Sequence, residues 1–299
     1  MSPIVQALFS PWEWRLEILI VLGSFGALYT LGWRRLRAAS RGRRGLATLP
    51  RLVSYWLGLI ILAVDLMSPI DYLGGQLFFM HMVQHLLSMM IAAPLLLLAN
   101  PFPFILWGLP PRARRAVGGM FARDAVVRRT MRTLTRPAVA WLTFITVYLG
   151  WHEPMLYDLA LRRSWVHDLQ HITFFLAAML FWWHVIGAGP RIHGRFPVWA
   201  RMGYLLGVIP LNMMISVAIA FSSTVIYSYY ESVPQIWGVT TLQDQMIAGV
   251  IMWIPGSMMF LLAALIVLAR FGITEKPNRR TPSPVTPVSP DSHGVPDPS

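Results

Sequence analysis

The segment LFFMHMVQHLLSMMIAAPLLLLA, residues 77–99, decides the fold of this chain. It contains no Asp, Glu, Lys or Arg, and it is long enough to cross the roughly 30 Å hydrocarbon core of a bilayer as an α-helix. Every backbone amide in lipid must be paired within its own segment, so we expect this stretch to be helical. Two histidines interrupt the apolar run, at positions where ionisable groups are costly.

The rest of the chain has the same character. Of its 299 residues, 56% are hydrophobic and only 13% are charged, about half the charged fraction of an ordinary soluble domain. That balance argues against a soluble enzyme and against a disordered chain. We predict an all-α polytopic membrane protein with seven transmembrane helices. The predicted spans are Trp14–Trp33, Leu52–Ile70, Leu77–Ala99, Pro137–Leu156, Val166–Ile186, Met202–Phe221 and Gln245–Ala269.

The positive charge follows the predicted spans. The chain carries 25 Lys and Arg against 13 Asp and Glu, and all the cations except Arg15, Arg162 and Arg163 fall in alternate links and in the C-terminal tail. Basic links remain in the cytoplasm, so we expect the N-terminus outside and the C-terminus in the cytoplasm. Topology and the lipid bilayer then account for the charge, and we expect no nucleic-acid partner.

These patterns divide the chain into three parts. Residues 1–13 form a predicted extracytoplasmic N-terminus, and residues 14–270 form the seven-helix membrane domain. Residues 271–299 are rich in Pro and Ser and poor in apolar residues, which predicts a disordered cytoplasmic tail.

Histidines gather at the outer side of the predicted membrane domain. His81 and His85 lie near the start of the third span, and His167 and His171 lie near the start of the fifth. Both pairs have i, i+4 spacing, which places two imidazole rings on one face of a helix. His152, at the outer end of the fourth span, lies at the same depth. These five histidines are our candidate metal ligands.

Copper, as Cu(I), is the metal that we expect. Imidazole binds Zn, Cu, Fe and Ni, and Cu(I) also accepts the thioether of methionines such as Met80 and Met82 beside the first pair. The chain has no cysteine, so thiolate ligands are excluded. Two outer carboxylates, Asp65 and Asp244, are expected either to cap helices or to orient the imidazoles.

Other interpretations remain open at this stage. The segment HDLQH places Asp168 where a zinc hydrolase carries its general base, but the usual Glu is missing and we do not predict an enzyme. One histidine from each of two helices could instead ligate a b-type haem. A metal or small-solute transporter would need polar groups along its whole path. In a scaffold without an ion, the histidines would only join helices.

Three segments together resemble a known family, the seven-span CtaG assembly proteins of caa3-type cytochrome c oxidase. They are MHMVQHLLSMMIAAPLLLLANP (80–101), WHEPMLYDLALRRSWVHDLQHITFFLAAMLFWW (151–183) and LQDQMIAGVIMWIPG (242–256). The resemblance implies a multi-pass factor of the bacterial plasma (inner) membrane that is needed to mature a haem–copper oxidase at a copper centre. Our own hypothesis is that the histidines bind the copper, that it comes from an extracytoplasmic copper donor, and that it passes to the oxidase subunit by ligand exchange. By motif match the resemblance assigns functional roles to His81, His85, His152, His167, His171, Asp244 and Gln245, with supporting roles for Asp65 and Tyr157.

Overall fold

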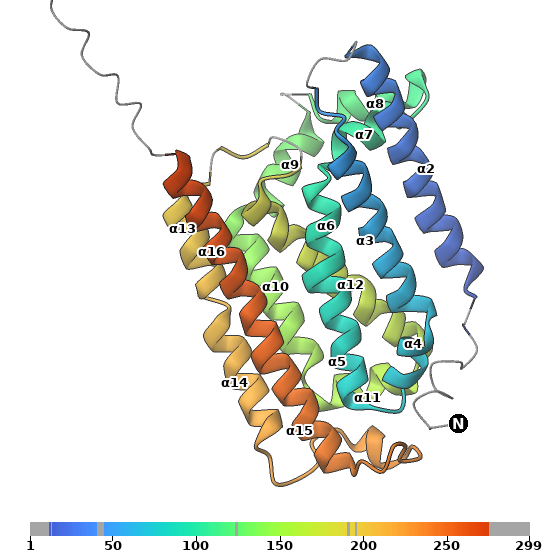
Figure 1. Ribbon diagram of the computed structural model, residues 1–299, viewed down its shortest axis with the longest axis vertical. Coiled ribbons are helices and arrows are strands. Elements are labelled where there is room, and N and C mark those ends of the chain that lie inside the picture. Colours follow the sequence, from blue (N-terminus) through green and yellow to red (C-terminus); the bar gives the residue numbers. More distant parts are fainter. Residues whose placement is uncertain are drawn as a thin grey trace, which may run out of the picture.

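The structure is a computed structural model that describes residues 12, 14–40, 45–122, 125–189, 192–194 and 196–274. Within these residues the regular elements are all helices, most of them packed side by side along the long axis of the molecule (Figure 1). The predicted all-α class is therefore confirmed. The predicted N-terminal part and tail lie almost wholly outside the described residues. The last helix, however, continues to Thr274, beyond the boundary predicted at residue 270.

Among the described residues, six helices are long and apolar enough to cross a membrane, which indicates a multi-pass membrane protein. Three are unbroken, and three consist of shorter helices joined end to end. The unbroken ones are α2 (Leu16–Ala39), α3 (Leu49–Met67) and α12 (Ser164–Ile186). The joined ones are α5 (Phe78–Leu86) with η1 (Leu87–Ala92) and α6 (Ala93–Leu98), α13 (Val198–Leu206) with α14 (Ile209–Ala220), and α15 (Thr241–Ile251) with η3 (Met252–Gly256) and α16 (Ser257–Thr274).

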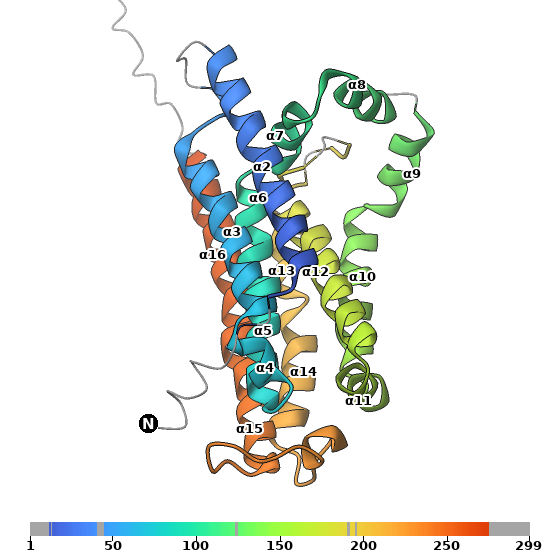
Figure 2. The ribbon, with the colours of Figure 1, turned by 90° about the vertical axis from the view of Figure 1, so that its right-hand side faces the viewer.

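The fourth predicted span, residues 137–156, is divided between two helices. α10 (Pro137–Trp151) has 15 residues, which is about 22 Å of helix and less than the hydrocarbon core of a bilayer. The chain then turns at His152, and the Glu153 side chain caps α11 (Pro154–Arg162) by accepting the backbone N–H of Leu156 at 2.9 Å. α10 nevertheless packs against α12 along the body of the molecule (Figure 2).

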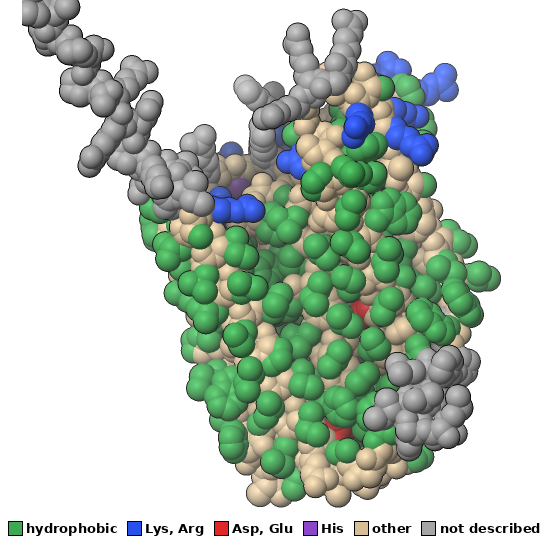
Figure 3. Space-filling model, viewed as in Figure 1, with side chains coloured by type: hydrophobic (Ala, Val, Ile, Leu, Met, Phe, Trp, Pro, Cys, Tyr) green, Lys and Arg blue, Asp and Glu red, His purple; other side chains and the backbone are tan. Residues whose placement is uncertain are grey.

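The short helices cover the two ends of the molecule. α4 (Pro69–Gly74), α11 and η2 (Ser228–Glu231) lie at one end, and α7 (Pro101–Gly108), α8 (Pro111–Met120) and α9 (Val126–Leu134) lie at the other (Figures 1 and 2). In Figure 3 the Lys and Arg side chains gather at the α7–α8 end, above a body that is largely hydrophobic.

Two π-helical turns interrupt long helices. η1 begins at Leu87, two residues after His85, and η3 contains Pro255. Proline removes a backbone donor from a helix. Pro255 lies within η3, and Pro94 lies two residues after the end of η1. Single π-helical turns are frequent at functional sites, and η1 lies next to one of the candidate ligands.

Close backbone contact fixes α2 against α7. A Cβ atom on Gly32 would overlap the backbone carbonyl of Phe104, and one on Gly108 would overlap that of Leu28. Small residues at such crossings let two helices approach within backbone contact, as is common between membrane helices. Glycine is therefore required at both positions of this crossing.

Candidate metal centre

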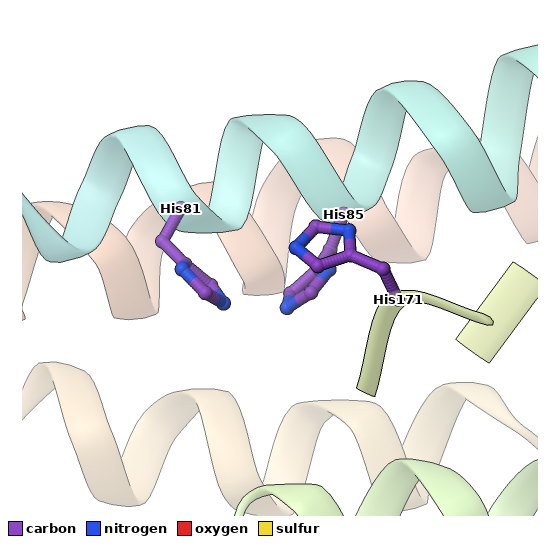
Figure 4. Close-up of side chains that lie close together, drawn as sticks. All are labelled: His81, His85 and His171. Atoms are coloured by element: carbon purple, nitrogen blue, oxygen red, sulfur yellow. The ribbon is translucent and has the colours of Figure 1, made fainter. Parts of the chain in front are cut away.

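Four histidines from two helices meet inside the bundle. His81 and His85 project from α5, and His171 projects toward them from α12 (Figure 4). The ring centroids of His85 and His171 are 4.9 Å apart, and those of His81 and His167 are 5.4 Å apart. The two pairs predicted at separate positions in the sequence therefore form one cluster, which we call the histidine quartet: His81, His85, His167 and His171.

The donor atoms of the quartet are placed as metal ligands would be. Nitrogen atoms of His81, His85 and His171 all lie within 4.8 Å of one another, and all three residues are buried. Both ring nitrogens of His81 and of His85, and Nδ1 of His171, are buried without a hydrogen-bond partner among the described residues. Buried polar groups are normally paired, so these nitrogens are an exception that a bound ion would account for.

The position of α5 depends on a carboxylate from another helix. Asp244 of α15 accepts the backbone N–H of Phe78 at 2.7 Å and that of Phe79 at 2.9 Å. These are donors in the first turn of α5, which have no partner within the helix itself. Asp244 therefore caps the helix that carries His81 and His85. The sequence left its role open between capping and orienting an imidazole; the structure shows capping, on α5.

His152 stands apart from the quartet. Its Nδ1 lies 2.6 Å from the carbonyl oxygen of Tyr148, one turn back in α10, and its ring is not among the groups of close donor atoms. His152 and His85 instead line a cavity of about 30 Å³, together with Met82. Met80 is half-buried and does not line this cavity.

Three other polar residues singled out in the sequence have structural partners. Asp168 forms a two-fold ion pair with Arg15, with Nη1–Oδ1 at 2.8 Å and Nη2–Oδ2 at 3.0 Å, and so joins the start of α2 to α12. The Tyr157 hydroxyl lies 3.2 Å from that of Tyr230. Gln245 accepts the backbone N–H of Ile226 at 2.7 Å, which ties α15 to the loop before it.

Asp65 differs from these three residues. It is fully buried, and neither carboxylate oxygen has a hydrogen-bond partner among the described residues. It lines a cavity of about 360 Å³ that also contacts His171, Arg15 and Asp168. An unpaired carboxylate in such a place is costly unless a cation or a proton compensates it.

Two polar residues of the site escaped the sequence-based prediction. Asp71 of α4 has a carboxylate oxygen within 4.8 Å of nitrogens of His167 and His171. Gln84, fully buried between His81 and His85 on α5, donates through Nε2 to Asp71 at 2.7 Å and to the carbonyl of Asp65 at 2.9 Å. Asp71 lies between two predicted spans, where an acidic residue is ordinary, and no spacing in the sequence links it to the histidines.

Comparisons with known proteins place the chain among proteins of related sequence. The family model described as "Cytochrome c oxidase caa3 assembly factor" matches residues 27–272. The chain is also 30% identical over 251 residues to "Uncharacterized protein Mb0105" of Mycobacterium bovis and to "Uncharacterized protein MT0111" of Mycobacterium tuberculosis. The match covers 80% of this chain but spans only 36% of each relative. No solved structure matches the chain.

Proposed function

Because this chain belongs to the family of caa3 cytochrome c oxidase assembly factors, we propose that it acts as an assembly factor in a bacterial plasma membrane. It binds copper, as Cu(I), through the histidine quartet. It receives the ion from an extracytoplasmic donor and passes it to a haem–copper oxidase subunit by ligand exchange.

The observation that carries this proposal is the set of buried ring nitrogens of the quartet that have no hydrogen-bond partner among the described residues. Imidazole nitrogens bind first-row metals at about 2.0 Å, so small side-chain rotations would bring three nitrogens within 4.8 Å of one another onto one ion. Nitrogen ligands suit Cu(I), and a site without thiolate would hold it more weakly. Weaker binding suits a protein that must release its ion.

The orientation of the protein is part of the proposal. The end with α7 and α8 faces the cytoplasm, because basic residues gather there (Figure 3). The opposite end, with α4 and α11, faces outward and adjoins the quartet, because Asp71 of α4 lies within 4.8 Å of His167 and His171. α10 crosses the membrane as a seventh span, shorter than the other six, beside α12.

Close packing of the rings favours a single ion over a haem. The centroid of His85 lies 4.4 Å from that of His81 and 4.9 Å from that of His171. A porphyrin would need a flat slot between the two helices, whereas these rings are in mutual contact. One histidine from each helix is also a suitable ligand set for a haem iron, so absorption spectroscopy is part of the experiment.

The deeper polar residues support delivery at the outer side over transport through the bundle. The Asn212 Nδ2 group donates to the carbonyl of Met252 at 2.9 Å, and its Oδ1 accepts from the Tyr148 hydroxyl at 2.7 Å. Hydrogen bonds to protein groups already occupy this side chain. Asp168, the residue in the position of a hydrolase base, is paired with Arg15. We therefore propose ligand exchange without covalent chemistry.

Metal analysis of the purified protein tests the proposal. We expect stoichiometric Cu(I), no haem absorption band, and loss of copper in the His81→Ala/His85→Ala double variant. His184→Gln is the matched control, because His184 is also buried in α12 but binds the carbonyl of Thr135 at 2.8 Å, far along the helix from the quartet. Wild-type protein that binds no copper, or that carries haem, would contradict the proposal.

A further inference from the structure

A second set of candidate metal-binding atoms overlaps the quartet. It consists of Asp71, His167 and His171, whose nearest ligand atoms lie within 4.8 Å of one another. Asp71 comes from α4, a short helix between α3 and α5, so this set draws on a third element of the fold. His171 belongs to this set and also to the set formed with His81 and His85.

The geometry around His171 suits an ion that moves between the two sets. Its Nε2 lies 3.2 Å from Nε2 of His167. Two ligands at about 2.0 Å from one ion, separated by the tetrahedral angle, would lie about 3.3 Å apart. The other ring nitrogen of His171, Nδ1, is buried and has no hydrogen-bond partner among the described residues. His171 is therefore the one ligand that the two sets share, and it can stay bound to the ion while the other ligands change.

The two sets differ in exposure and in chemistry. His81, His85 and His171 are buried, whereas Asp71 and His167 are half-buried. The inner set has only imidazole nitrogens, which carry no charge when they act as ligands. The outer set adds a carboxylate, which attracts a cation and compensates its charge. A cation that arrives from the end of the molecule with α4 therefore meets the charged, more accessible set first.

Gln84 links the two sets by a hydrogen bond. Its Nε2 donates to Asp71 Oδ1 at 2.7 Å, and the residue itself lies between His81 and His85 on α5. This hydrogen bond orients the carboxylate from the helix that carries the inner ligands. Residues that fix the orientation of a ligand in this way commonly change metal affinity when they are removed.

We propose that Asp71, His167 and His171 form an outer receiving site for Cu(I), from which the ion passes to the inner site of His81, His85 and His171. This inference rests on the proposed function. The transfer is a ligand exchange in which His171 stays bound while Asp71 and His167 are replaced by His81 and His85. The ion keeps its oxidation state throughout, so no electron donor or acceptor is required.

The rate of copper uptake tests the proposal. Purified full-length protein is mixed with Cu(I) held by a coloured, water-soluble chelator, and the loss of the coloured complex is followed by stopped flow. We expect Asp71→Asn to take up copper about tenfold more slowly, because a carboxylate at the mouth of a site raises the arrival rate of cations. Copper bound to the inner site at saturation should remain.

Three comparisons make the result specific. The Asp71→Asn side chain still offers an oxygen to Gln84, so the fold should be kept. Asp71→Glu retains the carboxylate and should load at nearly the wild-type rate. Asp158→Asn is the matched control, because Asp158 is a half-buried aspartate of α11 at the same end, bound to Ser228 and outside both sets.

The possible results separate the two proposals. Slow uptake by Asp71→Asn alone, with Asp71→Glu near wild type, supports the receiving site. Wild-type uptake by Asp71→Asn, or equal slowing by Asp158→Asn, overturns it while the inner copper site stands. Wild-type protein that takes up no copper at all contradicts the proposed function itself.

Discussion

His85 and His152 show how strongly the role of a histidine depends on its neighbours. Both are buried and both line the same small cavity. His85 has two nitrogens without partners among the described residues and lies against His81 and His171, whereas His152 has Nδ1 next to the carbonyl of Tyr148. By this difference His85 is a candidate metal ligand and His152 is a residue beside the ligands, although the sequence predicted both as ligands.

This difference predicts unequal effects of mutation. His152→Ala leaves the close donor groups intact, so copper stoichiometry should be unchanged and affinity should fall by about 10- to 100-fold, as for residues beside a metal site. His171→Ala removes a nitrogen from both close groups and should lower affinity by more than about 100-fold. Competition with a Cu(I) chelator measures both. Equal losses of copper affinity in the two variants would show that His152 is also a ligand.

At the scale of elements, the helix with the first histidine pair depends on contacts outside itself. α5 starts at Phe78, and its first backbone donors bind the carboxylate of Asp244 from α15. The same helix continues as η1 from Leu87, two residues after His85. The direction of the two imidazoles is therefore set by a cap at one end of α5 and by a π-helical turn at the other.

Asp244→Asn should reveal the contribution of this cap. Asn replaces one accepting oxygen with a donor that faces an N–H group, so one charge-assisted hydrogen bond is lost. We expect a destabilisation of about 2 kcal/mol, the usual contribution of a hydrogen bond to a charged group. Thermal unfolding in detergent measures it, and Asp158→Asn serves as the control near the surface. An unchanged unfolding temperature would show that the cap contributes little.

At the scale of the whole molecule, the membrane topology depends on α10. In the part of the chain that the structure describes, six helices meet the length expected of a span, and α10 is shorter but packs beside α12. Because α10 ends at His152, α11 lies at the same end of the molecule as α4 (Figure 1). If α10 crosses the bilayer, the links before it and after α14 lie on opposite sides.

Cysteine labelling tests this arrangement directly, because the natural chain has no cysteine. Thr133 lies in α9, before α10, and Ser232 lies in the loop between α14 and α15; both are exposed. We expect an impermeant maleimide to label Ser232→Cys in intact cells and Thr133→Cys only after the membrane is opened. Labelling of both positions from the same side would mean that α10 does not cross.

Much of the architecture was predictable because it depends on local physics. A long apolar segment must be helical in lipid, and i, i+4 spacing places two rings on one helix face wherever that helix packs. Six of the seven predicted spans, and the shared face of each histidine pair, follow from these two rules. The outer end of the fourth span was missed because the Pro154 start and Glu153 cap of α11 outweigh hydropathy there.

Tertiary structure decided which of these residues act together. The rotation and crossing of α5 and α12 bring the two histidine pairs into one cluster, and no local pattern encodes that rotation. The same packing pairs Asp168 with Arg15, uses Asp244 as a cap for α5, and brings Asp71 to His167 and His171. Hydropathy and helical spacing determine each helix separately. Contacts between distant helices depend on side-chain packing over the whole bundle, and they alone place Asp71 beside the histidines.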